Sequence, residues 1–215
     1  MLVATVIAGC AEPATPAVLR AAPATYLVSV DQLVAPDFSL DTAPHPLAVA
    51  DVAGTDRAAA QRLNSSGFVA GAGEDFFRPV GSLAQATGPV QIGDTVEEFQ
   101  AAAGAATVYS ADVTRLDAVT GATAVSTGSL GDAAHATTRT AASPDGTIVV
   151  EITVEWRVDN LLDVLVARGR DGATRPADAL LLAHRQTVAE LGLATPTPLP
   201  ALSPRGTATS TRTSP

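Results

Sequence analysis

Few side chains of this 215-residue chain have types suited to acid–base or metal chemistry. Its histidines are His45, His135 and His184, and its only cysteine is Cys10. Asp132 and His135 are three residues apart and are the weak candidates for an acid–base pair or for two metal ligands. A metal site needs three or four ligands, and no third lies nearby in the sequence. We therefore expect a turn leading into a strand here, and a domain with no catalytic residue, no cofactor and no enzymatic activity.

The cysteine closes the apolar run MLVATVIAGC at the start of the chain. The tetrapeptide Ile7-Ala8-Gly9-Cys10 resembles a bacterial lipobox, in which an aliphatic residue and two small residues precede a cysteine that becomes lipidated. The run lacks a positively charged n-region and barely reaches the length of a signal h-region, so we expect the leader to begin upstream of Met1. The alternative is an alanine-rich N-terminus with a chance cysteine.

The lipobox resemblance implies a location. Residues 1–9 would be the remnant of a removed signal peptide, and Cys10 would carry the acyl chains that hold the protein to the cell membrane. More than one acyl chain makes such anchoring stable. The resemblance therefore implies a lipoprotein on the extracytoplasmic side, whose membrane partner is reached through the lipid on Cys10.

Composition divides the rest of the chain into three parts. Residues 10–24, with the lipid attachment point, form a Pro/Ala-rich spacer, and residues 194–215 form a Pro/Thr/Ser-rich tail that we expect to be disordered. Residues 25–193 remain as a single globular domain. A net charge of -9 excludes nucleic acid as a partner, because nucleic-acid binding needs a basic surface.

The strongest local pattern lies in residues 147–158, TIVVEITVEWRV. Apolar and mostly polar positions alternate there among β-branched and aromatic residues, which predicts a long strand with one face buried and Trp156 in the core. Asp159-Asn160 predicts a turn, and residues 161–170 a second strand of the same hairpin. Because both faces of 161–166 are largely apolar, we expect that strand to lie inside the sheet.

The register of this hairpin stays open. A two-residue turn pairs Glu151 with Arg168, which is favourable, but it sets Asp163 opposite Trp156 on the apolar face. A three-residue loop would place Leu162 beside Trp156 instead. One residue of slip exchanges the two faces of the strand, so the sequence leaves both registers possible.

Two amphipathic helices are expected, near 105–118 and over 175–191. The second has Pro176 in its first turn and ends before Gly192. Its predicted buried stripe is Ala177, Leu181, His184, Val188 and Leu191, widened by Leu180. With further strands predicted at 67–78, 89–99, 122–127 and 133–141, the fold class is α+β, an antiparallel sheet with the helices packed on one face.

This layout is similar to the small exported sensor-like and lipoprotein domains of high-GC Gram-positive bacteria. The matching pieces are Gly67-Phe68, the 104–118 helix, Leu130-Gly131-Asp132, Trp156–Leu165 and the 176–191 helix. Most members of this group have no assigned activity. The resemblance therefore implies an exported α+β domain and no particular reaction.

The polar face of strand 147–158 offers weak candidates for a binding surface. We expect that face to be exposed, with Glu155, Arg157 and Arg168 as its binding candidates. The acidic neighbours Glu97-Glu98 and Glu74-Asp75 are expected on solvated faces. The sequence thus favours a non-enzymatic domain that binds a ligand, apolar or otherwise, or an envelope partner. The alternatives are a structural or accessory envelope protein, or an enzyme using Asp132 and His135.

Overall fold

The computed structural model describes residues 19, 21–35, 37–79, 81, 87–142 and 146–192. The strands are β1 (Ser39–Leu47), β2 (Phe68–Phe77), β3 (Gln91–Phe99), β4 (Thr123–Val125), β5 (Ala133–Ala142), β6 (Ile148–Val158) and β7 (Leu161–Arg170). The helices are α1 (Val49–Ala53), α2 (Arg57–Ser65), α4 (Ala102–Asp117) and α5 (Pro176–Glu190), with short 3-10 turns η1 (Pro23–Thr25) and η2 (Val30–Gln32). Cys10 and the 194–215 tail lie outside the described residues, so the predictions for them stay predictions.

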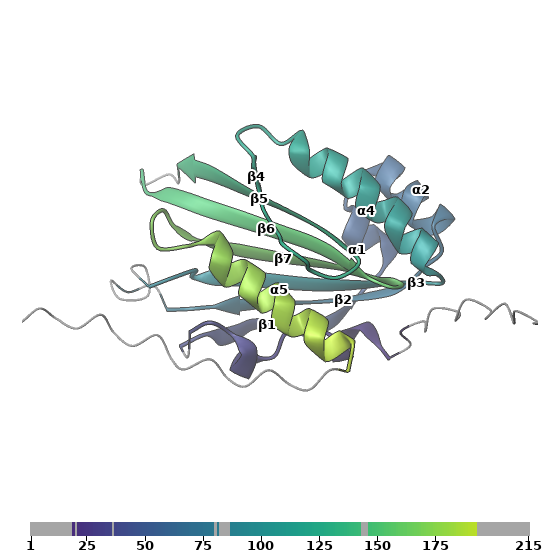
Figure 1. Ribbon diagram of the computed structural model, residues 1–215, viewed down its shortest axis with the longest axis horizontal. Helices are drawn as coiled ribbons and strands as arrows, with labels where there is room; N and C mark the ends of the chain where they lie inside the picture. The colour runs from purple at the N-terminus through teal and green to yellow at the C-terminus, as the bar shows by residue number, and fades with distance from the viewer. Residues whose placement is uncertain are drawn as a thin grey trace, which may run out of the picture.

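All seven strands form one antiparallel sheet in the order β1-β2-β3-β7-β6-β5-β4 (Figure 1). The predicted α+β class is therefore confirmed, and β7 is the central strand, as its two apolar faces indicate. Pro44 and Pro46 are accommodated in β1, an edge strand whose irregular pairing tolerates missing N–H donors.

The β6–β7 hairpin takes the register with a two-residue turn. Val158 pairs with Leu161 across Asp159-Asn160, and Asp159 adopts a positive φ of 54°. Glu151 consequently pairs with Arg168, and Asp163 stands opposite Trp156. Asp163, whose place opposite Trp156 makes this register look unfavourable in the sequence, is thus fully buried, at 0% exposure.

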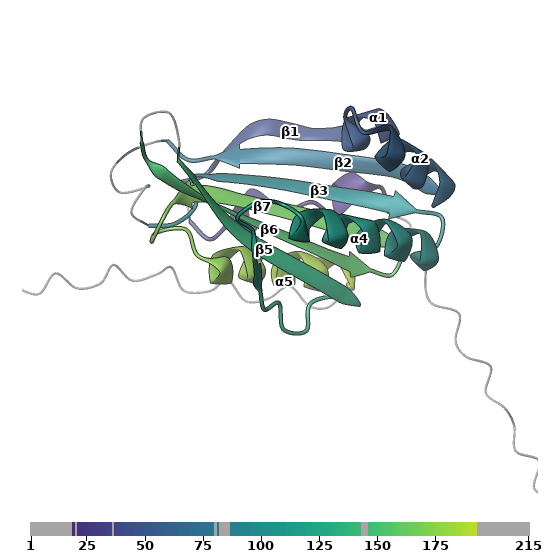
Figure 2. The same cartoon turned by 90° about the horizontal axis from the view of Figure 1, so that it is seen from above.

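The helices cover both faces of the sheet, not one. α5 lies on one face, while α4, α1 and α2 lie on the other (Figures 1 and 2). The expectation of a single covered face was wrong because the central strand is apolar on both sides. Leu165 belongs to the core under α5, and Leu162 belongs to the core under α4.

Helix α5 does not bury the stripe that its hydropathy predicts. His184 is exposed and Leu191 is 51% exposed, whereas Gln186 and Glu190 are buried. The remaining buried residues of the helix are Ala179, Leu182, Ala183 and Thr187. The prediction failed because the sheet face under α5 carries Asp163, so the polar side of the helix packs inward with Leu182.

On the opposite face, α4 is held in position by aromatic packing and by one close backbone contact with the end of α2. The rings of Phe68 and Phe99 meet edge to face, with centroids 5.9 Å apart, beneath the start of α4. At Gly104, an added Cβ would lie 2.0 Å from the carbonyl oxygen of Ser66, at the end of α2. Only glycine lets these two helix ends come so close, and this contact sets the position of α4 over the sheet.

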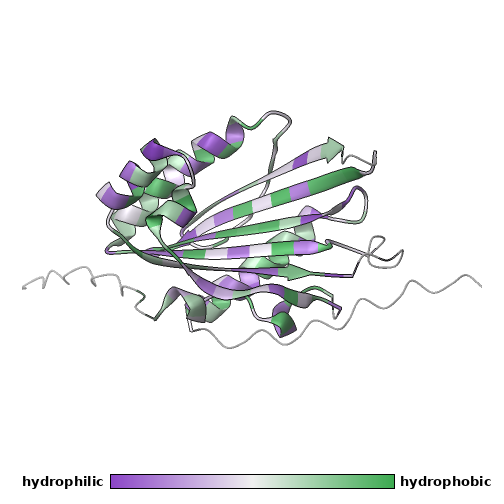
Figure 3. Ribbon diagram, turned by 180° about the vertical axis from the view of Figure 1, so that it is seen from behind, coloured by the Kyte–Doolittle hydropathy of each residue, from purple (hydrophilic) through white to green (hydrophobic). Residues whose placement is uncertain are grey.

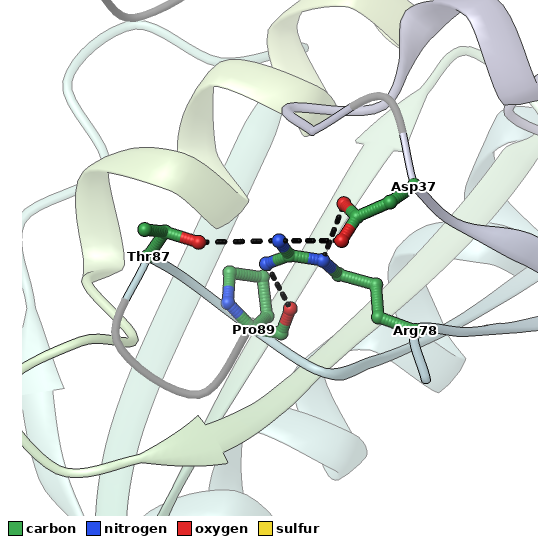
Figure 4. A network of polar contacts seen from close by, with 4 residues as sticks. All are labelled: Asp37, Arg78, Thr87 and Pro89. Carbon is green, nitrogen blue, oxygen red and sulfur yellow. Dashed lines mark hydrogen bonds and ion pairs between the residues drawn. The ribbon is translucent and has the colours of Figure 1, made fainter. Parts of the chain in front are cut away.

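Arg78, directly after β2, joins three segments that precede or follow strands (Figure 4). Its guanidinium donates two hydrogen bonds to Asp37, at 2.7 and 3.0 Å, one to the Thr87 hydroxyl and one to the Pro89 carbonyl. It also lies 5.5 Å from the centre of the Phe38 ring. The network holds the entries to β1 and β3 against the end of β2.

The packed part of the chain reaches back to Leu19. Its backbone N–H donates to the Asn160 side chain at 2.7 Å, and its carbonyl accepts from the same amide at 3.0 Å. Residues 19 and 21–24 thus contact the domain although the sequence assigns them to the spacer. Among the described residues, no helix has the length and hydropathy required to cross a membrane.

We expect Gly104→Ala to destabilise the domain by about 2 kcal/mol, because the new methyl group collides with Ser66 and displaces α4. Helix propensity alone predicts the opposite sign, a gain of about 1 kcal/mol. Urea unfolding followed by circular dichroism measures the difference. The control is Gly81→Ala, whose Cβ meets nothing within 4 Å. A Gly104→Ala protein as stable as the wild type would show that α4 is not held by this contact.

Candidate functional site

Three hollows of the described structure lie on the α4 face and meet around Val164 of β7. The largest, about 520 Å³, lies between the α1–α2 pair, α4 and the sheet. A second of about 220 Å³ lies between α4 and strands β5, β6 and β7, and a third of about 260 Å³ continues over β1, β2 and β3. Figure 3 shows that the helices gather at one end of this sheet face and leave the rest without helical cover.

The floor of these hollows mixes apolar and polar side chains. Val164 and Val166 of β7 alternate with residues that point to the other face, and Thr95 and Thr153 flank them on β3 and β6. The apolar part of the walls comes from Val52, Leu63, Val108, Leu116 and Val119, and charged side chains, among them Arg62, Asp112 and Arg115, line the same hollows. A ligand that fits here therefore needs a hydrocarbon part as well as polar groups.

Two carboxyl groups at the base of the hollows have buried oxygens without a hydrogen-bond partner among the described residues. Glu155 of β6 is 0% exposed, and neither of its carboxyl oxygens has a hydrogen-bond partner. Glu97 of β3 is 4% exposed and has one buried, unpartnered oxygen, Oε2. Because buried polar groups in native proteins are nearly always hydrogen-bonded, two such carboxyls lining a hollow require an explanation.

Burial and neighbouring charges change the acidity of both groups. Burial, reinforced by Asp112 of α4, raises the pKa of Glu97 to about 8 despite the opposing charge of Arg115. Burial also raises the pKa of Glu155 to about 9, with Asp112 and Glu97 adding to the effect and Arg115 again opposing it. Both side chains are therefore mainly protonated at neutral pH while the site is empty.

The predicted binding candidates lie on this face, but they do not form one patch. Glu155 is covered by α4, contrary to the expectation of an exposed face. The Arg157 guanidinium lies 3.7 Å from Asp132 and donates to the Asp159 carbonyl at the hairpin turn. Arg168 donates to Glu151 at 2.6 Å, and Arg139 donates to the other oxygen of Glu151 at the same distance, forming a rim across β5, β6 and β7.

Asp132 and His135 engage different partners. The Asp132 carboxylate accepts from the Asp159 N–H at 2.7 Å and so supports the β6–β7 turn. His135 Nε2 lies 2.9 Å from the Asp117 carboxylate at the end of α4. Within the described part of the chain, no three His, Cys, Asp or Glu side chains are grouped so that they could hold a metal ion.

Sequence reasoning missed Glu97 and Asp112, and it placed Glu74 and Glu97 on solvated faces. The structure buries both glutamates, because β2 and β3 lie inside the sheet. One signal was present in the sequence. Strand 89–99 has apolar residues on only part of each face, so an interior position for it requires buried carboxyls.

A second group of carboxyls lies in the core under α5. Burial raises the pKa of Asp163 and of Glu190, each of which acts on the other, and none of their four carboxyl oxygens has a hydrogen-bond partner among the described residues. Asp94 accepts from the Val28 N–H at 2.8 Å, yet burial raises its pKa to about 7. Burial and the adjacent Asp94 and Asp75 raise the pKa of Glu74 to about 7.

Comparisons with known proteins were made on sequence and on structure. The chain matches no protein-family profile and no curated protein sequence. It is similar to the solved extracellular domain of PknH from Mycobacterium tuberculosis, with 15% sequence identity and a TM-score of 0.37. The match covers 72% of this chain and 81% of that one. We draw no functional conclusion from a likeness of this degree.

The buried carboxyls predict an unusual pH dependence of stability. Their pKa values are higher in the folded than in the unfolded chain, where they lie near 4, so unfolding releases protons between about pH 4 and 9. The free energy of unfolding must then fall as the pH rises through this window. We expect it to be at least about 3 kcal/mol lower at pH 8.5 than at pH 5, measured by urea titration at each pH.

Glu190→Gln isolates one group, since glutamine keeps the shape of the protonated acid and cannot ionise. The variant should gain at least about 2 kcal/mol over wild type at pH 8.5 and little at pH 5. Glu98→Gln is the matched control, on β3 and only partly buried. A wild-type domain that is more stable at pH 8.5 than at pH 5 would contradict the protonated state of these carboxyls.

Proposed function

We propose that this chain is a lipid-anchored, extracytoplasmic, non-enzymatic binding domain whose small-molecule ligand occupies the hollows around Val164. The observation that carries the proposal is the pair of buried, unpartnered carboxyls at the base of these hollows. A buried polar group that has lost its hydration and gained no hydrogen bond costs free energy, unless a bound molecule supplies the missing hydrogen bond. Asp163 and Glu190 under α5 also have oxygens without a hydrogen-bond partner, but neither side chain lines one of the hollows described above.

The anchoring part of the proposal rests on the Ile7-Ala8-Gly9-Cys10 motif. A tether through lipid would leave the domain free at the membrane surface, with the spacer between the lipid and Leu19. The alternative of an accessory envelope protein with no small-molecule site is tested by whether the hollows hold a ligand. The alternative of an enzyme using Asp132 and His135 gains no support, because these two side chains serve separate contacts.

A substitution that fills the hollows tests the binding site. Val164→Trp places a large ring where the three hollows meet, on a face of β7 with free space, so we expect the domain to fold and its ligand to be excluded. Protein purified under native conditions is denatured, and released small molecules are detected by mass spectrometry. Wild type should release a compound that Val164→Trp lacks.

The control for this experiment is Val69→Trp, since Val69 is 52% exposed on β2 and lines none of the hollows described above. It should release the same compound as wild type. A wild-type domain that releases nothing from its native envelope, or a Val164→Trp protein that retains the compound, would favour the accessory role instead.

Lipid attachment is tested by metabolic labelling with an alkyne analogue of palmitate in the native host, with the gene expressed from its own locus. We expect wild type to be labelled and to sediment with membranes, and Cys10→Ala to be neither. Cys10→Ser serves as a conservative second variant, because serine has the size of cysteine but not its thiol. A Cys10→Ala protein that still carries the label would refute the anchor.

A further inference from the structure

The chemistry at the base of the hollows points to the charge of the ligand. Three carboxyl groups from three elements interact there: Glu97 from β3, Glu155 from β6 and Asp112 from α4. Glu97 and Asp112 line the hollow between α2, α4 and the sheet, and Glu155 lines the adjoining hollow, with Arg115 and Val164 lining both. Asp112 also raises the pKa of both glutamates. The side chain of Asp112 is only 19% exposed.

The nearby positive charge does not balance these groups. Arg115 lowers the pKa of both glutamates, but its own side chain is 60% exposed and pairs with Asp112 at 3.2 Å, one turn along α4. No oxygen of Glu155 receives a hydrogen bond from Arg115 or from any other described residue. Arg62 and Arg139 also line these two hollows, but the carboxyls that line them are twice as many as the arginines. An anionic ligand would therefore be repelled, whereas a cation would supply the hydrogen bonds that the buried carboxyls lack.

The kind of cation follows from geometry and from the walls. The carboxyls are not grouped closely enough to hold a metal ion in the described structure. A group with several N–H donors spread around it can reach carboxyls that stand farther apart. The walls beside it include Val108, Leu116 and Val164, which suit a hydrocarbon segment.

We propose that the ligand of this site is an organic cation, an ammonium or guanidinium group on a hydrocarbon chain, whose charged end is held beneath α4 by Glu97, Glu155 and Asp112. This inference rests on the proposed binding function and adds the chemical class of the ligand. The cation donates hydrogen bonds to the unpartnered oxygens of the two glutamates, and its chain lies over Val164.

Proton release distinguishes this site from an apolar pocket. Glu97 and Glu155 hold protons when the site is empty, with pKa values of about 8 and 9, and a bound cation favours their ionised forms. Binding therefore releases protons, and the affinity must rise with pH up to about 9. An alkylammonium ion keeps its own proton throughout this range, because the pKa of a simple amine lies above about 10.

The test uses hexylammonium, its neutral analogue hexanol and its anionic analogue hexanoate as probes. Each is titrated into the whole chain and followed by NMR, with the resonances of Val164 and Thr153 locating the site. Hexylammonium should bind about tenfold more tightly at pH 8.5 than at pH 6.5, while hexanol shows no such change. Hexanoate should be the weakest of the three at pH 8.5.

Matched variants assign the effect to the carboxyls. Glu155→Gln and Glu97→Gln keep the shape of the protonated side chains, so each should fold, lose part of the pH dependence and bind hexylammonium several-fold more weakly at pH 8.5. Glu98→Gln changes the neighbouring glutamate, whose side chain points to the opposite face, and should behave as wild type.

The outcomes separate this inference from the proposed function. Hexanol and hexylammonium binding equally at Val164, at both pH values, would overturn the cationic ligand and leave the hollows as a binding site. Preferential binding of hexanoate would also overturn it. If no probe shifts Val164 or Thr153 and no compound is released from the native protein, the proposed function and this inference fail together.

Discussion

The register of the β6–β7 hairpin is the constraint on which the rest of the structure depends. Its two-residue turn buries Asp163 beside Trp156 on one face and sets Glu155 and Arg168 on the other. A slip of one residue would exchange these faces and place Trp156 next to Leu162. In this register, acidic side chains are therefore buried on both faces of the central strands, and the helices that cover each face must pack against them.

The two helices accommodate these acids in different ways. α5 turns Gln186 and Glu190 toward the sheet and leaves Leu191 exposed, so the carboxyl of Asp163 is buried beside polar side chains. α4 covers Glu155 but brings Asp112, another acid, and leaves hollows beside it. Carboxyl oxygens without hydrogen-bond partners are thus buried on both faces, but those of Glu155 and Glu97 line hollows and those of Asp163 and Glu190 do not. This asymmetry, rather than any single residue, distinguishes the ligand site from structural burial.

The position of α4 links packing to this proposed site. The close approach of Gly104 to Ser66 and the Phe68–Phe99 contact hold the first turns of the helix at one end of the sheet. Asp112 and Arg115 then stand over β3 and β6, while Val164 stays at the junction of the hollows. A helix lying along the whole sheet would fill these hollows. Because α4 is held at one end of the sheet, space for a ligand remains beside it.

The sequence by itself determined the α+β class, the central position of strand 161–170, the burial of Trp156 and the extent of the main helices within a few residues, because alternation and helix-end signals are local properties. The hairpin register, the two covered faces, the inward polar side of α5 and the burial of Glu97 and Glu155 follow from long-range packing. Each of these depends on which strand lies beside which. A carboxyl on a strand is expected to be solvated until a neighbouring strand and a helix remove its water, and the position of a strand in the sheet is not a local property of the chain.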